Sequence, residues 1–503
     1  MMYGEEKSDS LIVAANLANN PQGAESVERR SGAKGNAEQP HMRRTQSRES
    51  MSQRLSRVRE AAKQRKKERF TALFHLLTAE ALENAFLSLS RKAAAGVDGV
   101  RWKDYAENLK VNIADLHRRL HQGSYRAQPG RRHYIPKADG KQRPLGIASL
   151  EDKIVQYALV KILNAVYEND FMGFSYGFRP GRSQHNALDA LATGLVRTNV
   201  NWVLDADISQ FFDKVSHEWL IRFIEHRIGD QRVIRLIRKW LTAGTSEEGE
   251  WRASEEGEWR ASEEGTPQGA VISPLLANIY LHYVFDLWAH QWRRRHATGN
   301  VVMVRNADDI VIGFDKRIDA QCFRIAMQRR LKEFGLTVHP KKTRLTEFGR
   351  FAAENRASRG KGKPETFNFL GFTHISGKDR SGRFMLIRKT RRDRMTATLK
   401  AIKDGLRKRW HYSIPEQGKW LRRVVQGYLN YHSVPGNYPM MRKFRIYVTD
   451  LWRRALRRRS QQDDTTWTKA NRLAAVWLPK VRVLHPWPVE RFTARHPRQE
   501  PGA

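Results

Sequence analysis

Short apolar runs that end at acidic residues stand out along the chain. Residues 301–304 are apolar, Asp308 and Asp309 follow after a polar turn, and residues 310–312 are apolar again. Runs of this length, bounded by turn residues, predict two buried strands joined by a tight turn. The segment 201–213 (NWVLDADISQFFD) predicts another buried strand with acids at its end.

Helical and hairpin patterns account for much of the remaining chain. Apolar residues at helical spacing predict helices at residues 51–92, 150–170, 214 to about 243, within 265–288, at 318–335 and from about 388 onward. Residues 131–147 contain an Ala-Asp-Gly turn between two short extended runs, which predicts a hairpin. Residues 367–374 predict a strand, and the Pro-rich tail from 479 is predicted to be extended.

Three segments differ in composition from the rest. Residues 1–50 are rich in Ser, Asn, Gly, Gln and charge, which predicts disorder. Residues 51–92 carry a basic helical face, interpreted either as a solvated surface or as an arm that binds nucleic acid. Residues 246–264 repeat the unit SEEGEWRA, an acidic insertion that we expect to form an exposed hairpin or loop.

The net charge narrows the choice of partner. The 503 residues include 91 Lys and Arg against 53 Asp and Glu, a formal charge of +38. Such a charge favours a polyanionic partner, because neutralised phosphates release counterions and drive binding. An anionic membrane surface fits the charge alone, but the early apolar stretch at 11–18 is too short to span a bilayer. The single cysteine, Cys322, excludes a disulfide framework and favours a reducing, intracellular location.

The acids suggest a chemistry for the site. Asp205 and Asp207 end one predicted strand, and Asp308 and Asp309 lie in the tight turn between two others. Asp207 and Asp308 can form a carboxylate cluster across neighbouring strands, and hard oxygen ligands of this kind suit Mg²⁺. Two such ions stabilise the attacking and leaving oxygens of a phosphoryl transfer. The alternative, in which these acids only cap turns, stays open at this point.

Two clusters of arginines are candidates for binding nucleic acid. The broken loop FSYGFRPGRS carries Arg179 and Arg182. The helical segment around 440–460 interleaves apolar residues with cations, which suits an apolar core face backed by a phosphate-facing one. Its candidate phosphate contacts are Arg453, Arg454, Arg457 and Arg458.

Residues from about 68 to 495 resemble a bacterial group II intron-encoded protein, a reverse transcriptase with maturase function. The resemblance rests on eight motifs in family order: AAAGVDGV, YIPKADGKQRPLGIASLEDKIVQ, FSYGFRPGRSQHNAL, WVLDADISQFFD, GTPQGAVISPLLANIYLH, ADDIVIGF, HPKKTRL and FNFLGF. It implies an α+β fold, a right-hand polymerase with an antiparallel sheet and helices. The implied order is a disordered extension at 1–50, a basic helical arm at 51–92, fingers and palm at 93–375, a helical thumb and maturase region at 376–495, and a tail at 496–503.

The resemblance also implies roles for individual residues. Asp207 and Asp308 would bind two Mg²⁺ ions, with Asp309 beside them as a third catalytic acid. The implied nucleotide-binding residues are Lys137 and Arg143 for the triphosphate, Gln268 for the pocket, Phe212 (or else Phe211) under the sugar, and Lys342 near the leaving pyrophosphate. The implied partners are intron RNA, a DNA primer or target and deoxynucleoside triphosphates, in the bacterial cytoplasm or nucleoid and without a membrane.

The chain departs from the family pattern in three places. Asn306 stands where the family has Tyr, the SEEGEWRA unit is duplicated, and no His/Cys-rich endonuclease module follows HPWPVERF. The leading hypothesis is RNA-templated DNA synthesis during intron mobility. The first alternative is a splicing maturase with weak or lost polymerase activity, which Asn306 favours. A further alternative is a reverse transcriptase recruited to repair or defence.

Overall fold

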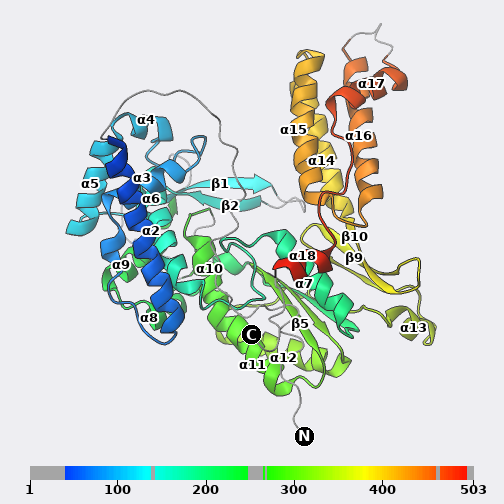
Figure 1. Cartoon of the computed structure of the whole chain (residues 1–503), viewed down its shortest axis with the longest axis horizontal. Coiled ribbons are helices and arrows are strands. Elements are labelled where there is room, and N and C mark those ends of the chain that lie inside the picture. The colour runs from blue at the N-terminus through cyan, green and yellow to red at the C-terminus, as the bar shows by residue number, and fades with distance from the viewer. Residues whose placement is uncertain (1–39, 137–141, 247–263, 267–268, 460–464, 496–503) are drawn as a thin grey trace, which may run out of the picture.

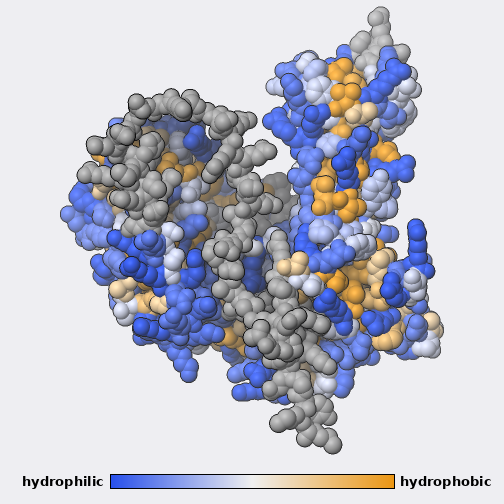
Figure 2. Space-filling model, viewed as in Figure 1, coloured by the Kyte–Doolittle hydropathy of each residue, from blue (hydrophilic) through white to orange (hydrophobic). Residues whose placement is uncertain are grey.

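The computed structural model describes residues 40–136, 142–246, 264–266, 269–459 and 465–495. Three parts are evident in Figure 1: an N-terminal lobe of helices, a central sheet below it, and a C-terminal bundle of helices that stands on the opposite side. The space-filling view shows an open notch between the upper parts of the N-terminal lobe and the C-terminal bundle (Figure 2). No helix among the described residues is long and apolar enough to cross a bilayer.

The central sheet is antiparallel and is buried on both faces. Its strand order is β5 (Val301–Asn306), β6 (Asp309–Phe314), β3 (Trp202–Asp207) and β7 (Arg344–Glu347). Along β3, Leu204 belongs to one hydrophobic core and Val203 to another, because successive side chains point to opposite faces. The strands predicted at 201–213 and 301–314 are therefore confirmed.

Helices cover both faces of this sheet. The core that contains Leu204 also takes in residues of α6 (Leu150–Tyr167), α8 (His217–Arg227), α9 (Gln231–Thr242), α10 (Ser273–Leu281) and α12 (Arg317–Glu333). The core that contains Val203 takes in α7 (Gln184–Arg197) and a second antiparallel sheet of β8 (Thr366–Phe369), β9 (Phe372–Lys378) and β10 (Phe384–Thr390). A π-helical turn, His282–Asp286, separates α10 from α11 (Leu287–His296).

The N-terminal lobe contains α2 (Pro40–Gln64), α3 (Ala79–Ser88), α4 (Trp102–Glu107), α5 (Leu109–Gln122) and the hairpin of β1 (Gly130–Pro136) and β2 (Gln142–Ile147). The predicted hairpin is confirmed, and β1 also pairs with β4 (Thr245–Ser246). The structure differs from the sequence expectation at the arm. Helix α2 begins at Pro40 within the segment predicted to be disordered, ends at Gln64, and buries Ala62 in the core. Residues 51–92 are thus two packed helices and not one free arm.

The C-terminal bundle has its own core. Helices α14 (Arg392–Lys408), α15 (Ile414–His432), α16 (Tyr438–Arg457) and α17 (Trp467–Trp477) pack around buried Leu421, Val448 and Trp452. The tail from 479 was expected to be extended throughout, but its described part contains α18 (Pro488–Arg495), which packs on α7 at the base of the bundle (Figure 1). Buried Phe492 provides the apolar contact that makes this helix form. The acidic repeat at 247–263 lies outside the described residues.

Candidate active site

Carboxylates gather where β3 meets the β5–β6 hairpin. The register places Asp207 of β3 directly opposite Asp309 of β6. Asp205 lies two residues before Asp207 and shares its face, because side chains alternate along a strand. Asp308 occupies the two-residue turn between β5 and β6. The structure thus brings together all three predicted catalytic residues, Asp207, Asp308 and Asp309, and adds Asp205.

A buried arginine holds the turn that carries Asp308. Arg305 of β5 is 0% exposed, and its Nε donates to Asp286 Oδ1 at 2.7 Å. The same guanidinium donates to the carbonyl oxygen of Ala307 at 3.0 Å and to Ser175 Oγ at 2.7 Å. Ala307 adopts φ 59°, in the left-handed region that costs energy for a side chain with a Cβ. The Arg305 network therefore stabilises a strained turn next to the acids.

The loop 174–177 packs against the turn that carries Asp308 and supports it. Its backbone pairs with Arg305, through Tyr176 N to Arg305 O at 2.8 Å and Arg305 N to Phe174 O at 2.9 Å. Asn278 Nδ2 donates to the carbonyl oxygen of Gly177 at 2.7 Å. A Cβ on Gly177 would overlap the backbone nitrogen of Ala307, so only glycine allows this approach. The FSYGF motif is in this respect a platform for the acidic turn.

Mutual repulsion and burial perturb the acids. Burial, followed by the charges of Asp309 and Asp207, raises the pKa of Asp205 to about 7. The pKa of Asp309 rises to about 6 through loss of water around the carboxyl group and the charges of Asp308 and Asp207, although the residue keeps solvent-exposed surface. Carboxylates held this close together favour a cation between them.

Lys342 lies against the cluster. Its Nζ is 2.9 Å from Asp207 Oδ2, and its side chain is 63% exposed. The turn that carries it is anchored to β3, because His339 N donates to the carbonyl oxygen of Asp207 at 2.7 Å. Lys342 and Arg391 both act to lower the pKa of Asp309, which shows that cationic charge reaches the cluster from two sides.

The donor set fits a hydrated divalent cation better than a closed metal cage. Among the described residues no group of three or more acidic, His or Cys side chains converges as a ready-made site. Mg²⁺ is commonly held by one or two carboxylates, with water and substrate phosphates as its other ligands. Burial, and after it the charges of neighbouring acids, raises the pKa values of Asp205 and Asp309, and a bound cation would offset the repulsion among these acids.

The structure places only some of the predicted nucleotide-binding residues. Lys137 and Gln268 lie outside the described residues, and Arg143 is placed by its backbone, opposite Ile135 in the β1–β2 hairpin. Phe212 is half-buried beside the start of the TPQG motif, since Thr266 N donates to its carbonyl oxygen at 2.7 Å. Phe211, the alternative to Phe212 under the sugar, is 3% exposed and packs in the hydrophobic core.

Two of the predicted nucleic-acid contacts are occupied within the protein. The side chain of Arg179 is 2% exposed and pairs with Glu168 at 2.9 Å. Arg182 donates to the carbonyl oxygens of Gly173 and Ser175, and burial lowers its pKa to about 10. Contrary to the prediction that they bind nucleic acid, these guanidinium groups stabilise the loop that supports the acidic turn. The Gly- and Pro-broken backbone leaves carbonyl groups that need donors, and the two arginines provide them.

The four predicted arginines at the C-terminal end of α16 divide into two kinds. Arg453 is largely buried, pairs with Asp450 at 3.0 Å and lies over the Trp467 ring at 4.8 Å. Arg454 also pairs with Asp450, at 2.7 Å, but its side chain is 68% exposed. Arg457 and Arg458 are exposed. The outer three are therefore accessible to a phosphate backbone, whereas Arg453 serves the fold.

Sequence reasoning assigned no role to two further residues, Asp205 and Gln156. Asp205 was visible as a second acid in the same strand, and period-two alternation was the signal that it shares the face of Asp207. Gln156 of α6 is 2% exposed, and its Oε1 accepts from Val271 N at 2.9 Å, which fixes the segment after TPQG. An amide in the middle of an apolar helix was the available signal for Gln156.

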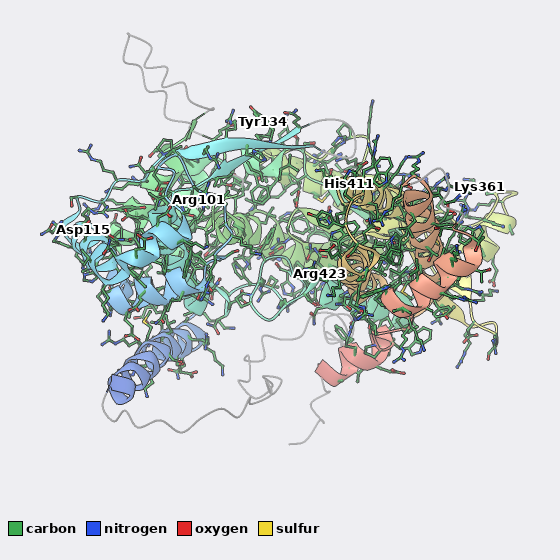
Figure 3. The ribbon with its side chains drawn as sticks, turned by 90° about the horizontal axis from the view of Figure 1, so that it is seen from above. Arg101, Asp115, Tyr134, Lys361, His411 and Arg423 are labelled. Carbon is green, nitrogen blue, oxygen red and sulfur yellow. The ribbon has the colours of Figure 1, made fainter. Side chains whose placement is uncertain are left out.

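Two lobes that carry polar side chains stand on opposite sides of the molecule. Seen from above, Arg101 and Tyr134 belong to the N-terminal lobe, while His411 and Arg423 belong to the C-terminal bundle across the centre of the molecule (Figure 3). A cluster of acids in a chain with a net charge of +38 suits a polyanion that is held by its phosphate backbone and extended at one point.

This geometry defines a class: a polymerase palm, an antiparallel sheet with paired acids between two helical lobes. Residues 135–374 match the model of the family described as reverse transcriptase (RNA-dependent DNA polymerase). This match supports the reverse transcriptase part of the resemblance drawn from the motifs, and with it the α+β polymerase fold of these residues.

Curated relatives point in the same direction. The chain is 41% identical over 214 residues to protein YkfC of Escherichia coli, covering 42% of this chain and 54% of the relative. It is 36% identical over 231 residues to the group II intron-encoded protein LtrA of Lactococcus lactis, covering 45% and 37%. It is 32% identical over 91 residues to the mitochondrial nuclear intron maturase 2 of Arabidopsis thaliana, covering 18% and 12%. The matched segments span about half or less of these relatives.

Proposed function

We propose that the protein is an RNA-directed DNA polymerase encoded by a group II intron, which copies intron RNA into DNA and also binds intron RNA to assist splicing. The observation that carries the proposal is the β3–β6 register, which sets Asp207 opposite Asp309 beside the Asp308 turn. The reverse transcriptase match at 135–374 and the similarity to LtrA support it. The N-terminal lobe, central sheet and C-terminal bundle correspond in this proposal to fingers, palm and thumb.

The residues have separate tasks in the reaction. Two Mg²⁺ ions, when bound, would supply Lewis-acid stabilisation of the attacking and leaving oxygens. Asp207 and Asp308 would hold them, with Asp309 adding negative charge from the opposite strand. The Lys342 ammonium would donate to the oxygens of the departing pyrophosphate, and its distance of 2.9 Å from Asp207 supports this role. Phe212 would lie under the sugar, while Lys137, Arg143 and Gln268 would contact the nucleotide.

RNA and DNA would be bound mainly through their phosphates. The charge of +38 and the exposed Arg454, Arg457 and Arg458 support this part of the proposal. The proposed partners are intron RNA, a DNA primer or target and deoxynucleoside triphosphates. The proposed location is where those partners meet, in the bacterial cytoplasm or nucleoid.

Primer extension on an RNA template tests the polymerase. Asp308→Asn keeps the size of the side chain but removes its charge, so synthesis should fall at least about a hundredfold if two-metal charge stabilisation operates. RNA binding should remain, because the phosphate contacts lie elsewhere. Asp115→Asn changes a partly exposed acid of the N-terminal lobe that pairs with Arg118 and Arg119; it is the matched control and should extend normally. Unchanged synthesis by the Asp308 variant would refute the metal assignment.

One observation favours a second candidate, a maturase with little polymerase activity. Asn306 pairs with Asp309 across the hairpin, at the position where the family motif has Tyr. Its short side chain lacks the ring that would pack against the primer end. The comparison of the parent protein with Asn306→Tyr decides between the two. Extension by the parent supports the polymerase, whereas extension by the Tyr variant alone supports the maturase.

A further inference from the structure

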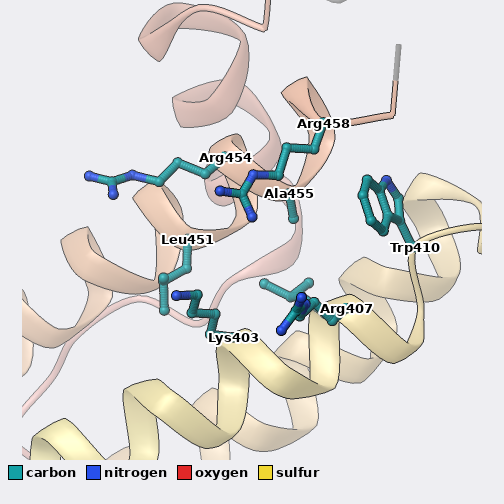
Figure 4. A pocket seen from close by; sticks show the side chains of 8 residues that line it. Lys403, Arg407, Trp410, Leu451, Arg454, Ala455 and Arg458 are labelled. Atoms are coloured by element: carbon teal, nitrogen blue, oxygen red, sulfur yellow. The ribbon is translucent and has the colours of Figure 1, made fainter.

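A cavity lies between two helices of the C-terminal bundle, far along the chain from the acids. Its volume is about 120 Å³, several times the liquid volume of one water molecule. Lys403, Leu406, Arg407 and Trp410 line it from α14 and the turn after it, and Leu451, Arg454, Ala455 and Arg458 line it from α16. Figure 4 shows the cations of both helices around the opening and the Trp410 ring at one end.

The cavity combines an apolar floor with a cationic rim. Leu406 is 2% exposed, and Leu451 and Ala455 are partly buried, so the floor offers no hydrogen-bonding group of its own. The cations occur in two pairs spaced four residues apart on facing helices, which puts each pair on one helix face. No carboxylate is among the lining residues. Arg454 pairs with Asp450, outside the lining, and three further cations remain on the rim.

The aromatic end of the cavity is fixed in place. Trp410 is 37% exposed, and its backbone nitrogen donates to the carbonyl oxygen of Arg407 at 3.3 Å. Gln417 Nε2 donates to the carbonyl oxygen of Arg409 at 2.7 Å, and Arg459 at the end of α16 donates to that of Tyr412. These bonds fix the backbone on both sides of Trp410, which limits the positions open to its ring and lowers the entropic cost of stacking a ligand on it.

We propose that this cavity binds an unpaired nucleotide of a structured RNA, with its base against Trp410 and its flanking phosphates on the cationic rim. A paired duplex presents phosphates but no free base face, so it would use the rim alone. An unpaired base also contributes stacking, and base–aromatic stacking is largely indifferent to base identity. This inference rests on the RNA binding proposed above and adds a preference for bulged or single-stranded positions.

Binding to two RNA hairpins tests the proposal with the full-length protein. One hairpin is fully paired, and the other is identical except for a single bulged 2-aminopurine, whose fluorescence falls when it stacks. The parent should bind the bulged hairpin about tenfold more tightly, as expected for one stacked base, and quench its fluorescence. Trp410→Ala should abolish the preference and the quenching while keeping the affinity for the paired hairpin. Arg407→Gln should weaken binding of both.

Controls separate the cavity from general charge and from folding. Arg423→Gln removes an exposed cation of α15 outside the cavity and should leave the preference unchanged. Thermal melting of the Trp410 variant, whose ring is partly exposed, should match the parent. The proposal would be overturned if the parent bound the two hairpins with equal affinity, or if Trp410→Ala kept the preference for the bulge. It would also be overturned if polyglutamate released the bulged hairpin as readily as paired RNA does.

Primer extension on an unstructured template distinguishes this inference from the proposed function. Trp410→Ala should extend such a template as the parent does, because the cavity is not part of the acidic site. If the parent does not extend the primer but still prefers the bulged hairpin, the proposed polymerase function is refuted and the proposed nucleotide site is supported. If the parent extends the primer normally but binds both hairpins equally, the polymerase function is supported and the nucleotide site is refuted.

Discussion

Glycine at position 177 decides how closely the supporting loop approaches the acidic turn. Any Cβ there meets the backbone of Asn306 and Ala307, which cannot rotate away as a side-chain end can. Short hydrogen bonds join the loop to the turn, so the added atom must displace either the loop or the turn. The displaced group closest to the chemistry is Asp308, one residue after Ala307.

Gly177→Ala is predicted to reduce the rate of primer extension more than stability. A shift of about an ångström in a catalytic group can cost on the order of a hundredfold in rate. The matched control is Gly427→Ala in α15, where a Cβ meets nothing within 4 Å and helix propensity favours alanine by up to about 1 kcal/mol. Single-turnover extension and chemical denaturation measure the two effects. Equal rates for both variants would contradict the assigned role of the glycine.

Strand β5 connects the acids to the π-helical turn. The Arg305–Asp286 ion pair is 0% exposed on both sides and joins β5 to residues 282–286. Isolated π-helical turns often occur at functional sites, because the extra residue reorients a side chain. Here Asp286 is the last residue of the turn, and its carboxylate neutralises the arginine that holds the acidic turn.

Breaking this ion pair should separate folding from activity. Arg305→Met leaves Asp286 buried and unpaired, which typically costs about 3–5 kcal/mol of unfolding free energy. The double variant Arg305→Met/Asp286→Leu removes both charges and should recover most of that stability. It should still extend primers poorly, because the hydrogen bonds to Ala307 and Ser175 are lost. Urea denaturation with primer extension tests this, and a double variant that regains full activity would contradict it.

Elements with strong local patterns were predictable from the sequence, and those fixed by tertiary contact were not. The strands at 202–207 and 301–314 carry continuous apolar runs that end at acids, so their positions and their acidic ends followed directly. Helix α18 comes after a Pro-rich segment and forms because Phe492 is buried against α7, which no local pattern reveals. Arg179 and Arg182 were predicted to contact nucleic acid because they lie in a broken loop. In the structure they donate to backbone carbonyl oxygens of that region, which no local pattern reveals.

For the molecule as a whole, charge governs binding and its salt dependence. We expect RNA affinity to fall steeply with salt, because each neutralised phosphate releases counterions. Arg457→Gln should reduce the slope of log affinity against log salt by about 0.7–0.9, as for one lost phosphate contact. Arg453→Gln is the matched control and should leave the slope unchanged, since Asp450 and Trp467 already occupy that guanidinium. Equal slopes for both variants would contradict this division of the arginines.

Buried histidines should make the whole fold sensitive to acid. Burial lowers the pKa of His374 to about 3 and that of His282 to about 4. The unfolded chain binds protons on these residues near pH 6.5, whereas the folded protein does not. More protons are then bound by the unfolded state, so the free energy of unfolding falls as pH falls from about 6.5 toward 4, by up to about 1.4 kcal/mol per pH unit for each histidine.

His374→Phe should flatten this acid sensitivity. His374 stacks on Phe367 with ring centroids 4.7 Å apart, so a phenyl ring keeps the contact and removes the titrating group. Urea midpoints measured between pH 6.5 and 4.5 should decline less steeply in the variant than in the parent. The difference between the two curves isolates His374, because every other group titrates in both proteins. His411→Gln, at an exposed site of the C-terminal bundle, should follow the parent curve. A His374→Phe curve parallel to that of the parent would mean that position 374 takes up its proton equally in both states, and that acid lability arises at other buried groups.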